Sequence, residues 1–203
     1  MERVIAYVDG FNLYFGLRSR GWRRYYWLNV RTLAQNLLKP SQTLLLTKYF
    51  TARIAGPPDK QKRQSTYIEA LETLSELQIF YGKYQLNPRQ CSQCGFRDEV
   101  PDEKMTDVNI AVEVLKDAYH DEFDVALLIS ADSDLVPPVR AVRELFPTKR
   151  VVVASPPGRY SVGLAKSASR SFVISRRNIA KSLLREEIKK ADGYILRCPS
   201  LWK

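Results

Sequence analysis

The feature of this chain that most constrains its fold is a repeated switch between short apolar runs and segments of helical periodicity. Runs rich in β-branched and aromatic residues are typical of buried strands, and apolar residues that recur every three or four positions are typical of helices. Strands that alternate with helices are joined by crossover connections, which make neighbouring strands parallel. The sequence therefore predicts an α/β fold with a doubly wound, mainly parallel sheet and helices on both faces. The predicted strands are residues 3–8, 43–51, 79–84, 125–130, 150–154 and 171–175.

The length of the chain favours one domain. With 203 residues, of which 45% are hydrophobic, it can bury a sizeable core. We expect a single domain over residues 1–192, with a loop insertion at about 85–103, where turn formers and charges show no period. Residues 193–203 are expected to form a C-terminal tail that packs back on the domain. The predicted helices include 60–77, 107–119 and 179–190.

Three observations indicate a cytoplasmic protein. No apolar run approaches the ~20 residues that a membrane span requires. The first residues carry an acid and a strand pattern where a signal peptide would carry a basic region and an apolar core. The three cysteines, an odd number, fit a reducing compartment better than a disulfide framework. We expect no contact with a membrane.

The charge of the chain indicates a polyanionic partner. Its 32 Lys and Arg against 22 Asp and Glu give a net charge of +10. In the stretch 18–27 the cations alternate with aromatic residues, a composition that suits the phosphates and unpaired bases of single-stranded nucleic acid. A soluble basic surface with some rings packed inward would explain the same stretch. The candidate nucleic-acid-binding residues are Arg18, Arg20, Arg23, Arg24, Lys60, Lys62 and Arg63.

Acidic side chains follow two of the predicted strands and open one predicted helix. Asp9 follows strand 3–8, Asp132 and Asp134 follow strand 125–130, and Asp107 opens a helix on its core-facing side. In doubly wound sheets the functional crevice lies outside the carboxyl ends of the strands. Carboxylates gathered there would repel one another unless a cation were present, and Mg²⁺ or Mn²⁺ suits their oxygens better than zinc does. Each acid alone is also common in a turn or a first helical turn, so the metal site depends on all four together.

At these residues the sequence resembles the NYN family, a branch of the PIN-like nucleases. The resemblance runs through VDGFNLY at 8–14, EKMTDVNIAVEVL at 103–115 and LLISADSDLVPPV at 127–139. It implies a PIN-like sheet of about five strands in the order 3-2-1-4-5 and a Mg²⁺- or Mn²⁺-dependent hydrolysis of RNA. By position it implies a metal-binding and catalytic set that consists of Asp9, Asp107, Asp132 and Asp134, together with Asn12 and Lys104.

The sequence departs from the family pattern at three positions. Ala131 and Met105 stand where glycine is expected or frequent, and Leu135 stands where phenylalanine is expected. None of these changes removes a carboxylate. They bear on the fit of the substrate more than on metal binding.

Two other classes of protein share part of this sequence pattern. Phosphatases of the haloacid dehalogenase type need an aspartate two positions before Asp9, where this chain has Tyr7. A PIN-like module that binds RNA with little or no catalysis has the same residues as a nuclease, because a fold and even a site do not guarantee turnover. RNA is the expected partner, and DNA is the alternative.

Cys91 and Cys94, in CSQCG, have the spacing of half a zinc site. A structural zinc site needs four ligands, and only His120 and Cys198 remain to complete it. A plain insertion loop is the favoured interpretation, and zinc shared across a homodimer is an alternative. His120 itself is expected to cap the end of its helix.

Overall fold

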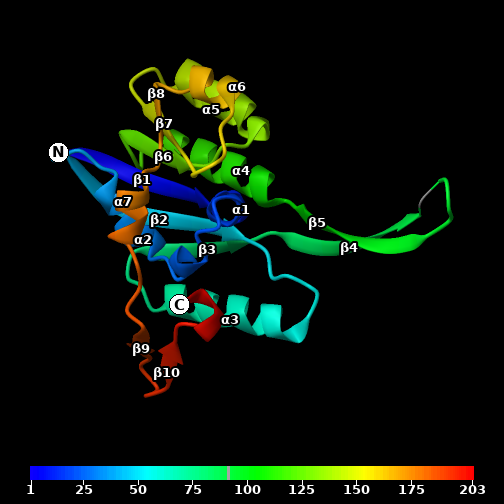
Figure 1. Ribbon diagram of the computed structural model, residues 1–203. Coiled ribbons are helices and arrows are strands. Elements are labelled where there is room, and N and C mark those ends of the chain that lie inside the picture. The colour runs from blue at the N-terminus through cyan, green and yellow to red at the C-terminus, as the bar shows by residue number, and fades with distance from the viewer. Residues whose placement is uncertain (91) are drawn as a thin grey trace.

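The computed structural model describes residues 1–90 and 92–203. Its centre is a six-stranded sheet in the order β3-β2-β1-β6-β7-β8, in which every neighbouring pair is parallel (Figure 1). Numbered within this sheet alone, the strands run 3-2-1-4-5-6, so the predicted order is confirmed and a sixth strand extends one edge. The strands are β1 (Glu2–Asp9), β2 (Gln42–Thr51), β3 (Leu77–Tyr81), β6 (Val125–Ile129), β7 (Arg150–Ser155) and β8 (Arg170–Val173).

Helices cover both faces of the sheet, as predicted. Alternate residues of β1 point to opposite faces: Val4, Ala6 and Val8 enter one core, and Ile5 and Tyr7 enter the other. The first core is shared with α1 (Gly10–Ser19), α2 (Val30–Asn36), α3 (Pro58–Glu72) and α7 (Arg176–Ala180). The second is shared with α4 (Thr106–Tyr119), α5 (Val136–Leu145) and α6 (Val162–Ser167). Across the described residues, no helix combines the length and the apolar character that a membrane crossing would require.

The sheet reverses its direction of growth between β1 and β6. From β1 the chain builds outward through β2 and β3, and it then returns to the other side of β1 and builds outward through β6, β7 and β8. Helix α1 begins directly after β1, and the short 3-10 helix η2 (Ser133–Leu135) begins soon after β6. The carboxyl ends of β1 and β6 therefore lie side by side at the point where doubly wound folds place their ligands.

The expected loop insertion at about 85–103 is a β-hairpin, which corrects the sequence analysis. Strands β4 (Lys83–Gln90) and β5 (Arg97–Lys104) pair antiparallel with each other and form a separate two-stranded sheet. Figure 1 shows this hairpin projecting far from the body of the molecule. Its described side chains are exposed or half-buried, and its sequence shows no regular alternation of apolar and polar residues that would have indicated a strand.

The prediction of a helix over residues 179–190 is also wrong. Helix α7 ends at Ala180, and the chain continues to β9 (Glu187–Lys189), which pairs antiparallel with β10 (Ile195–Arg197). The backbone N–H of Leu184 donates to the Trp27 carbonyl at 3.1 Å. This tertiary pairing outweighs the helical propensity of a segment rich in Lys, Arg and Glu. The expected boundary at 192 falls in the turn between β9 and β10.

The last residues pack against the body through aromatic rings. They form the 3-10 helix η3 (Ser200–Trp202). The ring of Trp202 lies 5.8 Å from that of Tyr26, 6.3 Å from that of Trp27 and 6.1 Å from that of Tyr67, measured between centroids. These contacts join the end of the chain to α3 and to the segment before α2.

Candidate active site

Asp9 stands at the end of β1 and caps the helix that follows. Its Oδ1 accepts a hydrogen bond from the backbone N–H of Asn12 at 2.8 Å, and its Oδ2 accepts one from the Ser130 hydroxyl at 2.9 Å. Asp9 is only 4% exposed. Burial, with a smaller contribution from the negative charges of Asp107 and Glu103, raises the pKa of Asp9 to about 7 although these two hydrogen bonds act to lower it.

Gly10 is required where the chain leaves β1. A Cβ at this position would lie 2.6 Å from the ring of Tyr49 and 2.7 Å from the backbone carbonyl oxygen of Phe50. The backbone carbonyl cannot yield as the end of a flexible side chain would. The Asp-Gly pair of the first motif therefore reflects close packing of α1 against β2.

Asn12 ties the first helix to the loop after β6. Its side chain is buried, and its Oδ1 accepts a hydrogen bond from the backbone N–H of Ala131 at 3.0 Å. Asn12 thus positions the loop that carries the next two acids. Asn12 therefore contacts both the carboxylate of Asp9, through its backbone N–H, and the loop after β6, through its side chain.

Asp132 and Asp134 are brought to the same edge of the sheet by that loop. The Oδ1 of Asp132 accepts from the backbone N–H of Asp134 at 3.1 Å and so caps η2. The backbone N–H of Asp132 donates to the Ser130 hydroxyl at 3.1 Å. The Ser130 hydroxyl, which donates to Asp9, therefore connects the acid after β1 to the acid after β6.

Asp107 joins this set from the first turn of α4. Burial raises the pKa of Asp107 to about 6, and the charges of Asp132 and Asp134 add to the effect. Its side chain lies at an open pocket of about 280 Å³. The residues that line the pocket are Glu103, Met105, Thr106, Asp107, Val108, Ala111 and Asp134.

Glu103 is a fifth carboxylate that sequence analysis missed. Burial and, to a smaller extent, the charges of Asp107 and Asp132 raise the pKa of Glu103 to about 7, although the hydrogen bond donated by the Thr106 hydroxyl acts to lower it. It was overlooked because it lies in the segment interpreted as a loop. Its spacing, four residues before Asp107 and next to Lys104, was the available signal.

Lys104 and Met105 form the junction between β5 and α4. Lys104 is exposed, ends β5 and stands opposite Lys83 in the hairpin register. Met105 has a φ of 75°, in the left-handed region that L-residues with a side chain rarely adopt. This conformation explains why glycine suits the position, and it places a strained residue in the wall of the pocket.

The chemistry of these residues fits a hard divalent ion. All five carboxylates supply oxygen, and the pKa values of Asp9, Asp107 and Glu103 are raised in part by the other acids, a cost that a bound cation would remove. Within the described residues, no three His, Cys, Asp or Glu side chains form a ready set of ligands. Mg²⁺ commonly needs only one or two carboxylates because it keeps several waters.

Most of the candidate nucleic-acid-binding residues are exposed, and two of them, Arg24 and Arg63, contact other side chains of the protein. Arg18, Arg20 and Arg23 are exposed near the end of α1, and Lys60 and Lys62 are exposed at the start of α3. The guanidinium of Arg24 donates to the Tyr25 hydroxyl at 2.8 Å, and that of Arg63 pairs with Asp59 at 2.7 Å.

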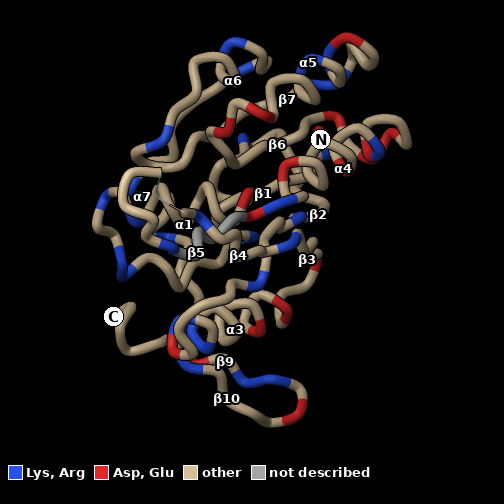
Figure 2. The backbone as a smooth tube through the Cα atoms, turned by 90° about the vertical axis from the view of Figure 1, so that its right-hand side faces the viewer, with Lys and Arg blue, Asp and Glu red and all other residues tan. Residues whose placement is uncertain are grey.

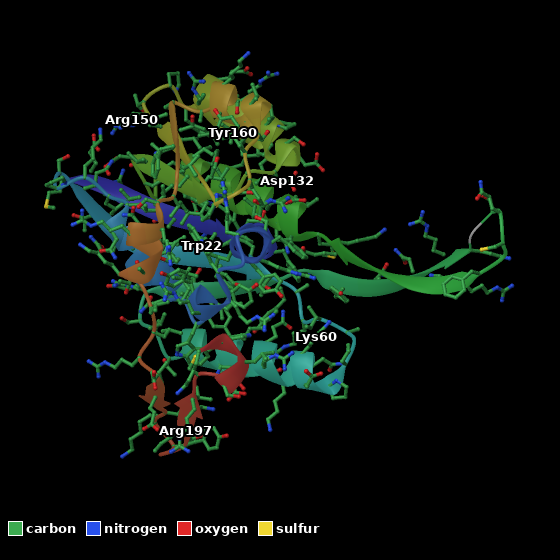
Figure 3. The ribbon with its side chains drawn as sticks, in the orientation of Figure 1. Trp22, Lys60, Asp132, Arg150, Tyr160 and Arg197 are labelled. Atoms are coloured by element: carbon green, nitrogen blue, oxygen red, sulfur yellow. The ribbon has the colours of Figure 1, made fainter. Side chains whose placement is uncertain are left out.

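These cations belong to separate segments of the chain, α3 and the region from α1 to η1 (Arg23–Tyr25). Figure 2 shows basic positions distributed over several segments, α3 and α7 among them. Figure 3 shows Lys60 on the same side of the molecule as Asp132, the side from which the hairpin projects.

The cysteine pair considered for zinc falls only in part within the described residues. Cys91 lies outside the described residues, and Cys94 is exposed with a free thiol. Cys198 is half-buried after β10, and His120 occupies the C-cap of α4, as expected. These candidates stand on separate segments, and they are not among any described group of three metal-binding side chains.

Comparisons with known proteins agree with this fold. A solved structure of a protein of unknown function from Vibrio parahaemolyticus is similar, with a TM-score of 0.57, 19% sequence identity, and coverage of 90% of this chain and 96% of that one. The curated 6-hydroxy-3-succinoylpyridine 3-monooxygenase HspA of Pseudomonas putida is 27% identical over 180 residues, which cover 70% of this chain and 55% of that protein. The chain thus spans about half the length of this relative, and the activity in its name is that protein's own.

The family is shown by a match over most of the chain. The model of the NYN domain matches residues 3–176, a range that contains all five carboxylates of the site and every strand of the six-stranded sheet apart from the first residue of β1. The chain therefore belongs to the NYN domain family, a family of PIN-like nucleases.

Proposed function

We propose that this protein is a ribonuclease that hydrolyses phosphodiester bonds with Mg²⁺ or Mn²⁺. The observation that carries the proposal is the gathering of Asp9, Glu103, Asp107, Asp132 and Asp134 at the switch point of the sheet, where they interact electrostatically. Four of these acids are buried or half-buried and Asp134 is exposed, and burying several neighbouring carboxylates is costly for folding unless they serve a cation. Such a set in a PIN-like nuclease family supports metal-dependent hydrolysis of a phosphate ester.

The acidic side chains divide into different roles. All five are candidates to hold the ion, which when bound would neutralise their charge, favour ionisation of water and stabilise charge on the phosphate. The hydrogen bonds from Asn12 and Ser130 hold the carboxylate of Asp9 in one orientation and leave a second lone pair on each oxygen, so we assign it to binding the ion.

Glu103 is assigned a different part. It lies at the open pocket, where its carboxylate is suited to accept a proton from an attacking water. Lys104, which is exposed and follows Glu103 in the chain, is assigned to interaction with a substrate phosphate.

RNA is the proposed substrate. The net charge of +10 favours a polyanion, and the exposed cations of α1 and α3 supply positive charge outside the acidic site. Cleavage of single-stranded RNA, structured RNA and single-stranded DNA of matched sequence, compared side by side, tests this choice. Preferential cleavage of DNA would contradict it.

The test of the nuclease is cleavage of labelled RNA by wild type, Asp9→Asn and Asp132→Asn across a titration of Mg²⁺ and Mn²⁺. We expect the wild type to cleave only with the ion and each variant to lose about 100-fold or more in rate. Asp192→Asn, an exposed acid in the turn between β9 and β10, is the matched control and should cleave as wild type does. Wild-type rates in the Asp9→Asn variant would show that the site is wrongly assigned.

The same assay separates the enzyme from a binding module. If the wild type binds RNA in EDTA but does not cleave it with either ion, the protein is an RNA-binding module and the nuclease proposal fails. Ion-dependent cleavage that Asp9→Asn abolishes excludes this alternative.

A further inference from the structure

Five aromatic rings form a continuous row that begins at the acidic site and crosses the outer side of α1. Consecutive ring centroids lie 6.4, 6.2, 5.4 and 5.0 Å apart along the row. We call this row the aromatic track. Its members, in spatial order, are Tyr84, Phe11, Phe15, Tyr14 and Tyr26.

The aromatic track is partly open to solvent, and none of its rings is fully buried in the core. Leu13 and Leu17 form the inward side of α1, whereas Tyr14 is 39% exposed and Phe15 is 41% exposed. Tyr84 and Phe11 are half-buried. Neighbouring apolar rings that stay open to water are typical of a binding surface, because rings that serve only to pack the core are buried.

One end of the track is joined to the acidic site. Phe11 lies between Asp9 and Asn12 in the sequence, and Tyr84 stands opposite Glu103 in the register of β4 and β5. Burial raises the pKa of Tyr84, and the charge of Glu103 adds to it, which shows that the phenol and the carboxylate are near each other. A ligand stacked on the first rings would therefore reach the carboxylates.

The other end of the track is flanked by cations. Burial and Tyr14 raise the pKa of Tyr26, while the charges of Arg18 and Arg23 act in the opposite direction. Both arginines are exposed. Rings next to exposed guanidinium groups provide a partner for bases and a partner for phosphates within one surface.

We propose that the aromatic track is a stacking platform for the unpaired bases of single-stranded nucleic acid and leads the strand into the acidic site. The proposal rests on the proposed nuclease function and names the form of its substrate. Stacking on protein rings requires bases that expose their faces, which a duplex does not offer. The flanking arginines and the net charge of +10 favour a polyanion over a protein with an apolar surface.

The test measures binding in EDTA, where cleavage plays no part. A labelled oligouridine of about 12 nucleotides, within the site sizes known for such platforms, is compared with an RNA duplex of the same length. The variants are Tyr14→Ala and Phe15→Ala, because both rings are exposed and neither lies among the proposed catalytic residues. We expect about 10-fold weaker binding of the single strand for each variant and little change for the duplex.

Two further variants make this test specific. Phe15→Trp keeps a stacking ring and should bind the single strand as tightly as wild type does. Tyr119→Ala removes a ring that is 75% exposed at the end of α4, outside the track, and should leave binding unchanged. Circular dichroism and thermal unfolding of each variant show whether its fold is retained.

The outcomes for the track and for the nuclease are distinguishable. If Tyr14→Ala and Phe15→Ala bind the single strand as wild type does, or if binding of the duplex falls equally, the track is refuted even when Asp9→Asn abolishes cleavage. If single-strand binding falls as expected but the wild type cleaves nothing with Mg²⁺ or Mn²⁺, the track stands and the nuclease proposal fails.

Discussion

At the scale of single residues, Ser130 holds two acids of the site in place. Its hydroxyl donates to Asp9 and accepts from the backbone N–H of Asp132. Ser130 is fully buried, so water does not replace these hydrogen bonds when the hydroxyl is removed. The sequence did not point to it, since a serine after a strand is common in turns.

Replacing Ser130 by alanine is expected to destabilise the protein by about 1–3 kcal/mol, because a buried carboxylate and a backbone N–H each lose a partner. Urea unfolding measures the change. Ser133→Ala, which truncates an exposed serine three residues further on, is the control and should change the free energy of unfolding by less than about 0.5 kcal/mol. Equal stabilities of the two variants would contradict the role of Ser130.

Asp9 gives the stability of the metal-free protein a definite dependence on pH. The pKa of Asp9 is about 7 in the folded state, against the 3.8 of an unperturbed aspartate. Between these values the folded protein holds a proton that the unfolded chain has released. The stability that this proton provides is therefore fully present below about pH 4 and is lost as the pH rises through about 7.

We expect Asp9→Asn to remove this loss, which is of the order of a few kcal/mol for a buried group. The measurement is urea unfolding of wild type and variant in EDTA between pH 5 and pH 8. The difference between the two proteins isolates Asp9 from Glu103 and Asp107, whose raised pKa values act in the same direction. If the difference in stability does not change with pH, the carboxyl of Asp9 is not perturbed as described.

At the scale of the elements, α4 and β2 are joined by a buried ionic cluster. The Nζ of Lys48, on β2, lies 2.5 Å from an Oε of Glu113 and 2.7 Å from an Oδ of Asp117, and the Tyr7 hydroxyl donates to Asp117 at 2.6 Å. The side chain of Lys48 is 5% exposed and that of Glu113 is 12% exposed. Glu113 lies off the apolar stripe of α4, a position that by itself favours a solvated charge, because the stripe does not reveal a cation on a neighbouring strand.

Lys48→Met is expected to destabilise the protein by about 3–5 kcal/mol, because it leaves buried carboxylates without their cation. Lys116→Met is the matched control: Lys116 also contacts Glu113, at 3.2 Å, but its side chain is 56% exposed. Its loss should cost no more than about 1 kcal/mol. Chemical unfolding of both variants measures these values, and equal effects would show that burial of the cluster does not determine its strength.

Burial also decides which elements the sequence could predict. The strand at 125–130 was recognisable because β6 is buried along its whole length, and the order of the central strands followed from the family resemblance. The hairpin β4–β5 was missed because it has little contact with the core and carries no hydrophobic period. Glu103 lies in the same segment, which was interpreted as a loop. The four aspartates were therefore expected at the site, and this fifth carboxylate was not.

At the scale of the whole molecule, the body and the projecting hairpin contribute differently to stability. The six-stranded sheet is covered by two hydrophobic cores, whereas β4 and β5 pair only with each other (Figure 1). Folding of the body therefore does not depend on the outer part of the hairpin. Its base is different, since Tyr84 and Glu103 face the site and stand opposite each other in the register.

Replacing residues 86–101 with Asn-Gly is expected to preserve the fold, because the pair Gln85 and Asp102 then closes on a two-residue turn that favours hairpins. We expect the free energy of unfolding to change by less than about 1 kcal/mol, as for surface changes outside a core. Leu71→Ala, at a fully buried position of α3, should cost about 2–5 kcal/mol in the same urea titration and shows that the assay detects damage to the core. A trimmed protein as unstable as Leu71→Ala would mean that the hairpin supports the body, and the division of the molecule into body and arm would be wrong.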